Sequence, residues 1–208
     1  MKTLRFAAAF LFLALPGLAS AAVSFDSPRG RFRLQVQAED AGGRELLPLA
    51  IIISPADGGA PMTMRVQVPG YKMPDDRRLR EMFHFSPNET TVAIFNPRSL
   101  TISNFRVVPL VRRPWQETDL EAESVEWADD DRMVFRGLGV DNFYIGVLDV
   151  RTGKVVKANP ALSMNTEFDI IQVTPKTIVF REEDASKVET CYSVDTRRGK
   201  RRKQDCPK

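Results

Sequence analysis

The sequence of 208 residues contains few of the side chains from which metal, thiol and imidazole sites are built. Two cysteines and one histidine are too few for a disulfide-rich scaffold or a histidine-rich metal site. After the first 22 residues, no apolar run approaches the ~20 residues that cross a bilayer. The whole sequence has an ordinary globular composition, 43% hydrophobic and 27% charged. We therefore expect a single domain over residues 23–208, with no cofactor and no metal.

The first 22 residues have the layout of a secretory signal peptide. Lys2 and Arg5 precede an apolar stretch at 6–18, and small residues follow at 19–22. Because the apolar stretch is short and broken by a Pro-Gly pair, a stable membrane anchor is the weaker interpretation. We expect a signal peptide at 1–22 and a periplasmic or secreted protein, in an oxidising compartment where a disulfide can form.

Alternating apolar residues predict short strands along the whole chain. Residues 32–38 and 62–68 place apolar side chains on one face and polar side chains on the other. Short apolar runs at 49–53, 92–95 and 170–173 are typical of strands buried on both faces. No stretch has the periodicity of a helix, and turn residues separate the runs closely. This pattern predicts an all-β fold.

A repeat organises the C-terminal half. Residues 124–158 have the pattern of four successive strands, and residues 168–205 match them element by element. An earlier copy begins near 85, and the first copy, which is more diverged and carries an insertion, begins near 27. A four-strand unit of ~40–45 residues is typical of propeller blades, which bury their faces only against neighbouring sheets. Equivalent residues stand 45 or 46 positions apart: Phe135 and Phe180, Asp149 and Asp195, Gly153 and Gly199.

Two motifs resemble the blades of TolB-type and WD40-type propellers. They are Phe85-Ser86-Pro87-Asn88 before a strand, and residues 144–154 across a hairpin. The resemblance implies a propeller-like array of about four antiparallel four-stranded sheets, fewer than the usual six or seven. A closed four-bladed ring, an open arc of sheets and a β-sandwich all fit this number.

The two cysteines lie symmetrically about Arg198-Gly199. A two-residue turn there would place Cys191 opposite Cys206 on adjacent strands, as a cross-strand disulfide requires. We expect this disulfide to clamp the last hairpin. No CxxC spacing points to a redox centre.

Positive charge is concentrated at the C-terminus. Residues 197–208 hold seven cations and one anion, whereas residues 23–196 hold 21 cations and 26 anions. A basic outer strand protects a sheet edge from pairing with other chains. The alternative interpretation is a docking patch for an acidic protein, an anionic glycan or a membrane surface. Nucleic acid is a poor partner, because the body is acidic and the basic run lacks aromatics. The candidate partner-binding residues are Arg197, Arg198, Lys200, Arg201, Arg202 and Lys203.

Few residues are candidates for catalysis, and we expect no catalytic site. His84 lies in an expected strand with Ser86 on the same face, but no nucleophile motif accompanies them. The acidic run 129–131 lacks the alternating ligands of a calcium loop and is expected to be a solvated turn. If the protein were an enzyme acting on a polysaccharide, His84, Glu126 and Asp169 would be its candidate residues.

These patterns favour a non-enzymatic module that binds a protein partner. The organisation is similar to that of periplasmic immunity proteins of type VI secretion systems. That resemblance implies an inhibitor or immunity protein that blocks a partner enzyme, such as a cell-wall or lipid hydrolase. The alternatives are a cell-envelope assembly factor of TolB-like type and a polysaccharide hydrolase or lyase. Self-association stays open, because an incomplete ring would expose apolar sheet faces.

Overall fold

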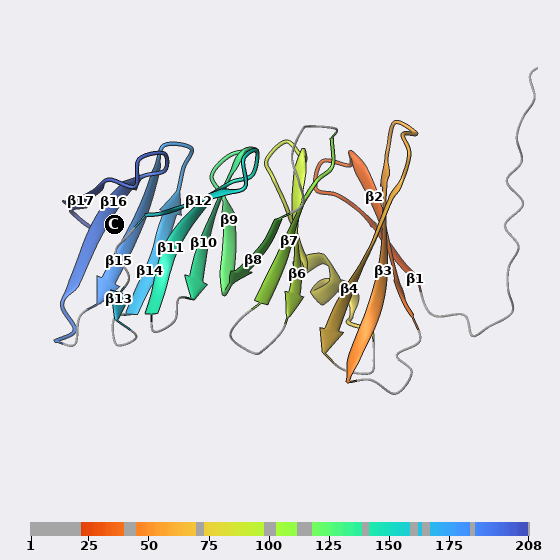
Figure 1. The fold of residues 1–208 in the computed structure, drawn as a ribbon, viewed down its shortest axis with the longest axis horizontal. Coiled ribbons are helices and arrows are strands. Elements are labelled where there is room, and N and C mark those ends of the chain that lie inside the picture. The colour runs from red at the N-terminus through yellow and green to blue at the C-terminus, as the bar shows by residue number, and fades with distance from the viewer. Residues whose placement is uncertain are drawn as a thin grey trace, which may run out of the picture.

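Four antiparallel sheets make up most of the described chain, and each contains four consecutive strands, as the repeat predicts. They stand face to face in an open row, with the first and last sheets at opposite ends (Figure 1). The expected all-β, propeller-like array of about four antiparallel sheets is confirmed. The computed structural model describes residues 22–39, 45–69, 73–97, 103–111, 118–138, 142–158, 162–163, 167–183 and 186–207. The expected signal peptide lies outside these ranges, apart from its last position, Ala22.

The sheets follow one another in chain order. Sheet 1 contains β1 (Ala22–Asp26), β2 (Phe32–Ala38), β3 (Leu46–Pro55) and β4 (Met62–Pro69). Sheet 2 contains β5 (Phe83–Phe85), β6 (Thr91–Pro97), β7 (Ser103–Pro109) and β8 (Thr118–Ala122). Sheet 3 contains β9 (Ser124–Trp127), β10 (Arg132–Leu138), β11 (Asn142–Asp149) and β12 (Lys154–Lys157), and the short β13 (Leu162–Ser163) also pairs with β11. Sheet 4 contains β14 (Glu167–Val173), β15 (Thr177–Glu183), β16 (Glu189–Asp195) and β17 (Arg201–Gln204).

Apolar side chains fill the three spaces between neighbouring sheets. Each buried cluster draws on two adjacent sheets: Leu34 and Ile94 join sheets 1 and 2, Ala93 and Phe135 join sheets 2 and 3, and Val134 and Phe180 join sheets 3 and 4. Successive residues of β6 and of β10 therefore point into different clusters. Each inner sheet is held by both of its neighbours, as in other stacked repeats.

The two outer faces of the row are largely polar. On sheet 1, the residues that alternate with the buried ones along β2 are Arg33, Gln35 and Gln37, and all three are exposed. On sheet 4, Ser193 and Arg202 pair on the face opposite the apolar cluster. A row that ends on polar faces needs no further sheet to cover it.

Three apolar runs were expected to be buried on both faces, and this holds for the inner sheet but not for the terminal sheets. Residues 92–94 of inner sheet 2 are buried on both faces, as expected. In β3 of terminal sheet 1, alternate residues are buried, but Ile52 on the outer face is only half-buried. In β14 of terminal sheet 4, Ile171 is 42% exposed beside a β-bulge between Ile170 and Gln172. A terminal sheet has a neighbour on one side only, so its strands cannot be covered twice.

A short helix, α1 (Asp76–Glu81), precedes sheet 2, although the sequence pattern predicts no helix. Asp75 caps it, because its side chain accepts a hydrogen bond from the backbone N–H of Arg78 at 2.9 Å. Leu79 is its buried residue. Six residues with one buried position are too few to show a helical stripe. Within the described ranges, no helix is long and apolar enough to cross a membrane.

Polar contacts join the turns of successive sheets. The β5–β6 turn reaches sheet 1 through Glu89 and sheet 3 through Asn88. The backbone N–H of Asn88 donates to Asp130 Oδ1 at 2.7 Å. Arg132 Nη1 of sheet 3 then donates to Thr196 Oγ1 of sheet 4 at 2.8 Å. We call these five residues, Asn88, Glu89, Asp130, Arg132 and Thr196, the turn relay.

Glu89 is the most buried acid of this relay. The residue is 1% exposed, and its backbone adopts a φ of 54°, which is uncommon for a residue other than glycine. Its carboxylate accepts hydrogen bonds from Ser27 Oγ at 2.7 Å and from the backbone N–H groups of Arg29 and Arg31. These donors compensate the cost of burying a charge. The β1–β2 turn is thereby fixed to sheet 2.

Replacing this acid tests the relay. Glu89→Gln keeps the shape of the side chain but puts an N–H₂ group where the turn offers only donors. We expect the free energy of unfolding, measured by urea titration, to fall by about 1–3 kcal/mol. The control is Glu39→Gln, whose carboxylate pairs with Arg65 at the surface, and it should change stability by less than about 0.5 kcal/mol. Equal effects of the two substitutions would contradict a special role for Glu89.

Phe135 packs directly over a glycine of the adjacent strand. Gly146 is its register partner, and a Cβ at Gly146 would lie 2.2 Å from the Phe135 ring. On the same strand as Phe135, a Cβ at Gly137 would lie 2.6 Å from the ring of Tyr144. Both glycines serve close approach of an aromatic ring.

Gly146→Ala should therefore overpack sheet 3. We expect the free energy of unfolding to fall by about 1–3 kcal/mol. Chemical denaturation monitored by circular dichroism measures this loss. Phe135→Leu in the same chain should relieve part of this loss, because the smaller side chain vacates the space of the new methyl group. If the two losses simply add, the steric explanation is wrong.

Candidate functional site

The C-terminal hairpin turns through four residues, 196–199, between β16 and β17. Asp195 fixes this turn, since its carboxylate accepts hydrogen bonds from the backbone N–H groups of Arg197 at 2.9 Å and Arg198 at 2.8 Å. Gly199 completes the turn with a φ of 64°. The expected two-residue turn at Arg198-Gly199 is wrong. In its common form it would need the left-handed conformation at Arg198 as well, which a side chain disfavours.

The expected disulfide between Cys191 and Cys206 is confirmed, with Cα atoms 5.1 Å apart. The longer turn shifts the register, so Cys191 pairs with Gln204, and Cys206 lies beyond the end of β17. Cys191 is 1% exposed. The bridge thus fastens the residues that follow β17 to the inner strand β16. Both cysteines of the chain are in this bond, so neither is a free thiol.

Five of the six candidate partner-binding cations are exposed, namely Arg197, Arg198, Lys200, Arg202 and Lys203. Arg201 is not one of them. Its guanidinium pairs with Glu182 Oε2 at 2.7 Å and lies 3.3 Å from the ring centroid of Tyr192. Arg201 therefore holds β17 to its own sheet, and the other five cations are left for a partner.

The neighbouring hairpin of sheet 3, between β11 and β12, has the same design. Asp149 accepts hydrogen bonds from the backbone N–H groups of Arg151 and Thr152, both at 3.0 Å. Gly153 has a φ of 67°, as its equivalent in sheet 4 does. The repeat therefore puts Arg151 and Lys154 where sheet 4 has Arg197 and Lys200. Sequence reasoning missed these two cations, although their 46-residue spacing from the sheet 4 pair could have revealed them.

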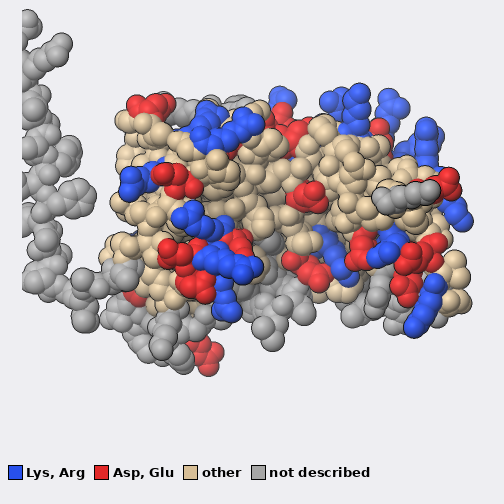
Figure 2. Space-filling view, turned by 180° about the vertical axis from the view of Figure 1, so that it is seen from behind, with Lys and Arg blue, Asp and Glu red and all other residues tan. Residues whose placement is uncertain are grey.

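A groove of about 420 Å³ lies between these two hairpins, and the cations Arg151, Lys154 and Arg197 line it together with the acids Asp129, Asp131 and Asp149. A second hollow, of about 200 Å³, lies on the other side of the last hairpin, and Arg198, Lys200 and Arg202 line that one. Figure 2 shows Lys and Arg side chains gathered along one edge near the C-terminal end of the molecule. We call Arg151, Lys154, Arg197, Arg198, Lys200 and Arg202 the basic edge.

Acids at the same edge accept hydrogen bonds within the turns or form ion pairs. The pKa of Asp195 is held below its ordinary value by the hydrogen bonds from the N–H groups of Arg198 and Arg197. Asp129 pairs with Arg132. The six cations of the basic edge and Arg132 stand against four acids, Asp129, Asp131, Asp149 and Asp195, so this edge carries net positive charge.

The acidic run 129–131 is more structured than the expected solvated turn. All three residues are partly buried. Asp130 accepts hydrogen bonds from Asn88, and Asp131 lies 3.8 Å from Arg151 in an ion pair. In the described part of the chain, no group of three or more His, Cys, Asp or Glu side chains is placed to hold a metal ion.

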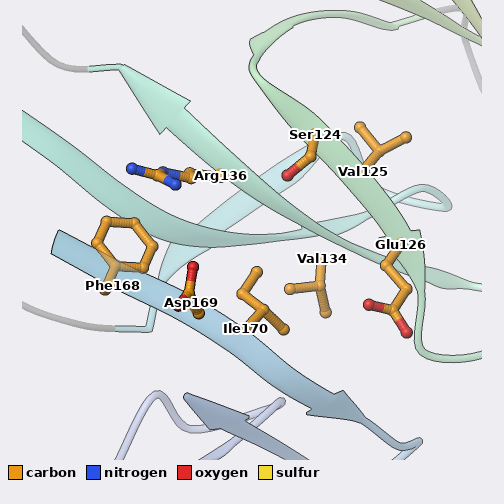
Figure 3. A pocket seen from close by; sticks show the side chains of 8 residues that line it. All are labelled: Ser124, Val125, Glu126, Val134, Arg136, Phe168, Asp169 and Ile170. Atoms are coloured by element: carbon orange, nitrogen blue, oxygen red, sulfur yellow. The ribbon is translucent and has the colours of Figure 1, made fainter. Parts of the chain in front are cut away.

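The structure brings together two of the three candidate catalytic residues. Glu126 and Asp169 both line a groove of about 230 Å³ between sheets 3 and 4 (Figure 3). His84 is elsewhere, because it pairs in register with Ala93, which lies in the cluster between sheets 2 and 3. Residues directly opposite one another in an antiparallel pair share a face. Sheet 3 therefore separates the imidazole from both carboxylates.

Ser86 is not available to His84 as a nucleophile. The residue is 2% exposed, and its hydroxyl accepts hydrogen bonds from the backbone N–H groups of Thr90 at 3.1 Å and Thr91 at 3.2 Å. Burial lowers the pKa of His84 below its ordinary value, although a backbone hydrogen bond with Glu81 acts in the opposite direction. The imidazole is therefore mainly neutral at pH 7.

No protein-family model matches the chain, and no curated protein matches it. The solved structures that resemble it include two hydrolases. Acylaminoacyl peptidase from Pyrococcus horikoshii is 14% identical with a TM-score of 0.48, and the match covers 89% of this chain and 32% of that one. The AtxE2 isopeptidase in its apo form is 12% identical with a TM-score of 0.39, and the match covers 89% of this chain and 45% of that one. This chain thus spans less than half the length of either, and likenesses this distant do not bear on its activity.

The lowered pKa of His84 predicts how stability depends on pH. Below the ordinary pKa of 6.5 the unfolded chain takes up a proton that the folded chain resists, so stability falls as pH drops through that value. We expect His84→Gln to reduce the slope of unfolding free energy against pH between about pH 7.5 and 5.5, measured by urea titration. An unchanged slope would show that other groups cause it.

Proposed function

We propose that this protein is a non-enzymatic binding module that docks an acidic protein surface on its basic edge. The observation that carries the proposal is the division of charge at the ends of sheets 3 and 4. The cations there are exposed, while the nearby carboxylates are hydrogen-bonded into turns. Two hairpins of the same design repeat this arrangement side by side. An acidic partner would meet positive charge from both of them.

The partner is an enzyme of the cell envelope, and the protein acts as an inhibitor or immunity protein that blocks it. Support for this finer statement comes from the resemblance to immunity proteins of type VI secretion systems. A cell-wall or lipid hydrolase is the class of partner we propose. A module of this kind needs rigid, well-fixed turns, and the turn relay and the disulfide supply them here.

The proposed location is the periplasm or the medium. The N-terminal sequence supports it, because residues 1–22 have the layout of a signal peptide. The disulfide is compatible with it, since such bonds persist in oxidising compartments.

A catalytic role has less support than a binding role. A polysaccharide hydrolase or lyase would need an acid and a base at one site, but His84 lies on the far side of sheet 3 from Glu126 and Asp169. Asp169 is also paired with Arg181 at 2.9 Å. Glu126 and Asp169 therefore lack the histidine that the sequence grouped with them as a catalytic residue.

Charge reversal tests the proposal. The mature chain is immobilised and exposed to envelope extracts, retained proteins are identified, and each is then purified for affinity measurement. The triple variant Arg197→Glu, Arg198→Glu, Lys200→Glu should weaken binding at least about tenfold, and affinity should fall as salt rises from about 0.05 to 0.5 M. An inhibited partner would lose activity when the wild-type chain is added and keep it with the variant.

The control variant changes the same number of cations at the other end of the molecule. Arg33→Glu, Arg65→Glu, Arg77→Glu alters exposed side chains on sheet 1 and α1. It carries the same net charge as the test variant, so a partner that recognises charge in general would lose affinity for both. Loss confined to the control, or equal loss in both, would contradict docking on the basic edge.

A further inference from the structure

The groove between sheets 3 and 4 is separate from the basic edge, and it has features of a small-ligand site. It measures about 230 Å³ and is lined by residues of β9, β10 and β14. Figure 3 shows Arg136 and Phe168 at one end and Glu126 at the other. The groove-lining residues are Ser124, Val125, Glu126, Val134, Arg136, Phe168, Asp169 and Ile170.

Arg136 is held in place by two aromatic rings and by an ion pair with Glu123. Its guanidinium lies 4.8 Å from the ring centroid of Phe143 and 4.5 Å from that of Phe168. Its Nε is 2.9 Å from Glu123 Oε2, close enough for an ion pair, yet this buried nitrogen makes no hydrogen bond. Among the described residues, none accepts a hydrogen bond from the two terminal nitrogens. A guanidinium fixed between rings with free donors is suited to a carboxylate, which it can bind with two parallel hydrogen bonds.

The opposite end of the groove carries negative charge. Glu126 is exposed, and no described residue forms an ion pair with it. It pairs in register with Val134, whereas Arg136 pairs with Ser124. Glu126 and Arg136 therefore share one face of sheet 3 and stand two register positions apart. Two positions correspond to about 7 Å along a strand.

The floor between these charges is apolar. Val134 and Ile170 both belong to the cluster between sheets 3 and 4 and also line the groove. Asp169 lines the groove as well, but its carboxylate is engaged with Arg181 at 2.9 Å. The groove thus has an acceptor end at Glu126 and a donor end at Arg136, with two apolar side chains and the paired carboxylate of Asp169 between them (Figure 3).

We propose that this groove binds a small zwitterionic peptide, two residues long, with its carboxylate on Arg136 and its ammonium group on Glu126. An extended chain advances about 3.3–3.6 Å per residue, so two residues match the two register positions that separate Glu126 from Arg136. The volume is below the range of about 300–1,000 Å³ typical of pockets for larger ligands, which disfavours a longer peptide. The apolar floor favours aliphatic side chains.

The probe is the dipeptide alanyl-leucine, compared with its N-acetyl and its C-terminal amide derivatives. Binding to the full mature chain is measured by isothermal titration calorimetry and by NMR shifts of the groove residues. We expect the zwitterion to bind and each blocked derivative to bind about tenfold more weakly, because each lacks one charge-assisted contact. No binding at millimolar concentrations, or equal binding of the three compounds, would overturn the proposal.

Two variants assign the ends. Glu126→Gln should weaken alanyl-leucine about tenfold but leave the N-acetyl derivative unchanged, because that derivative has no ammonium group to lose. Arg136→Gln should weaken alanyl-leucine and leave the amide unchanged. Variants that weaken all three compounds equally would contradict the assigned orientation. Glu126 is exposed, so its variant tests the proposal even if Arg136→Gln unfolds the chain, which thermal melting would reveal.

The control for both variants is Glu81→Gln on α1, far along the chain from the groove. It should leave the affinity for all three compounds as it is. The proposals for this groove and for the basic edge are tested separately, because the triple charge reversal at the basic edge should not change dipeptide binding.

Discussion

Apolar residues of each sheet in this protein are covered mainly by the neighbouring sheets of the row. Three buried clusters satisfy that constraint, and each draws its side chains from two adjacent sheets. Polar contacts between the turns at one edge of the row also fix each sheet to its neighbour. Glu89, in the β5–β6 turn, accepts hydrogen bonds from sheet 1, and Arg132, at the start of β10, donates one to sheet 4. The hairpins that carry the basic edge are held by the same stack.

Much of this architecture could be predicted from the sequence, because strands and repeats leave periodic patterns. The four-strand units, the equivalence of Phe135 with Phe180, and the pairing of the two cysteines all follow from spacing. The hairpin register was not predictable from spacing alone. The register depends on Asp195, whose carboxylate accepts hydrogen bonds from two backbone N–H groups and so favours a four-residue turn. The symmetric placement of the two cysteines in the sequence favours a two-residue turn instead. The burial of Glu89 left no signal either, since its donors are about 60 residues away in the sequence.

The candidate sites were harder to predict from the sequence than the fold, because they depend on contacts between distant residues. The basic hairpin could be recognised in the sequence as a run of cations. Of the six candidate cations in it, Arg201 alone is not exposed, because it pairs with Glu182. Arg151 and Lys154 join it through the repeat. The groove residue Arg136 was not found, because its environment is made by rings from two other strands, Phe143 and Phe168. His84 was grouped with two carboxylates by residue type, and a whole sheet lies between them.

The open row also has a consequence for how the molecule comes apart. In a closed ring every blade has two neighbours, but here sheets 1 and 4 have one each, so detaching either of them breaks a single interface. Fraying should therefore begin at the ends and spare the middle. The covalent bridge between Cys191 and Cys206 sits within the last sheet, where it resists unravelling from that end.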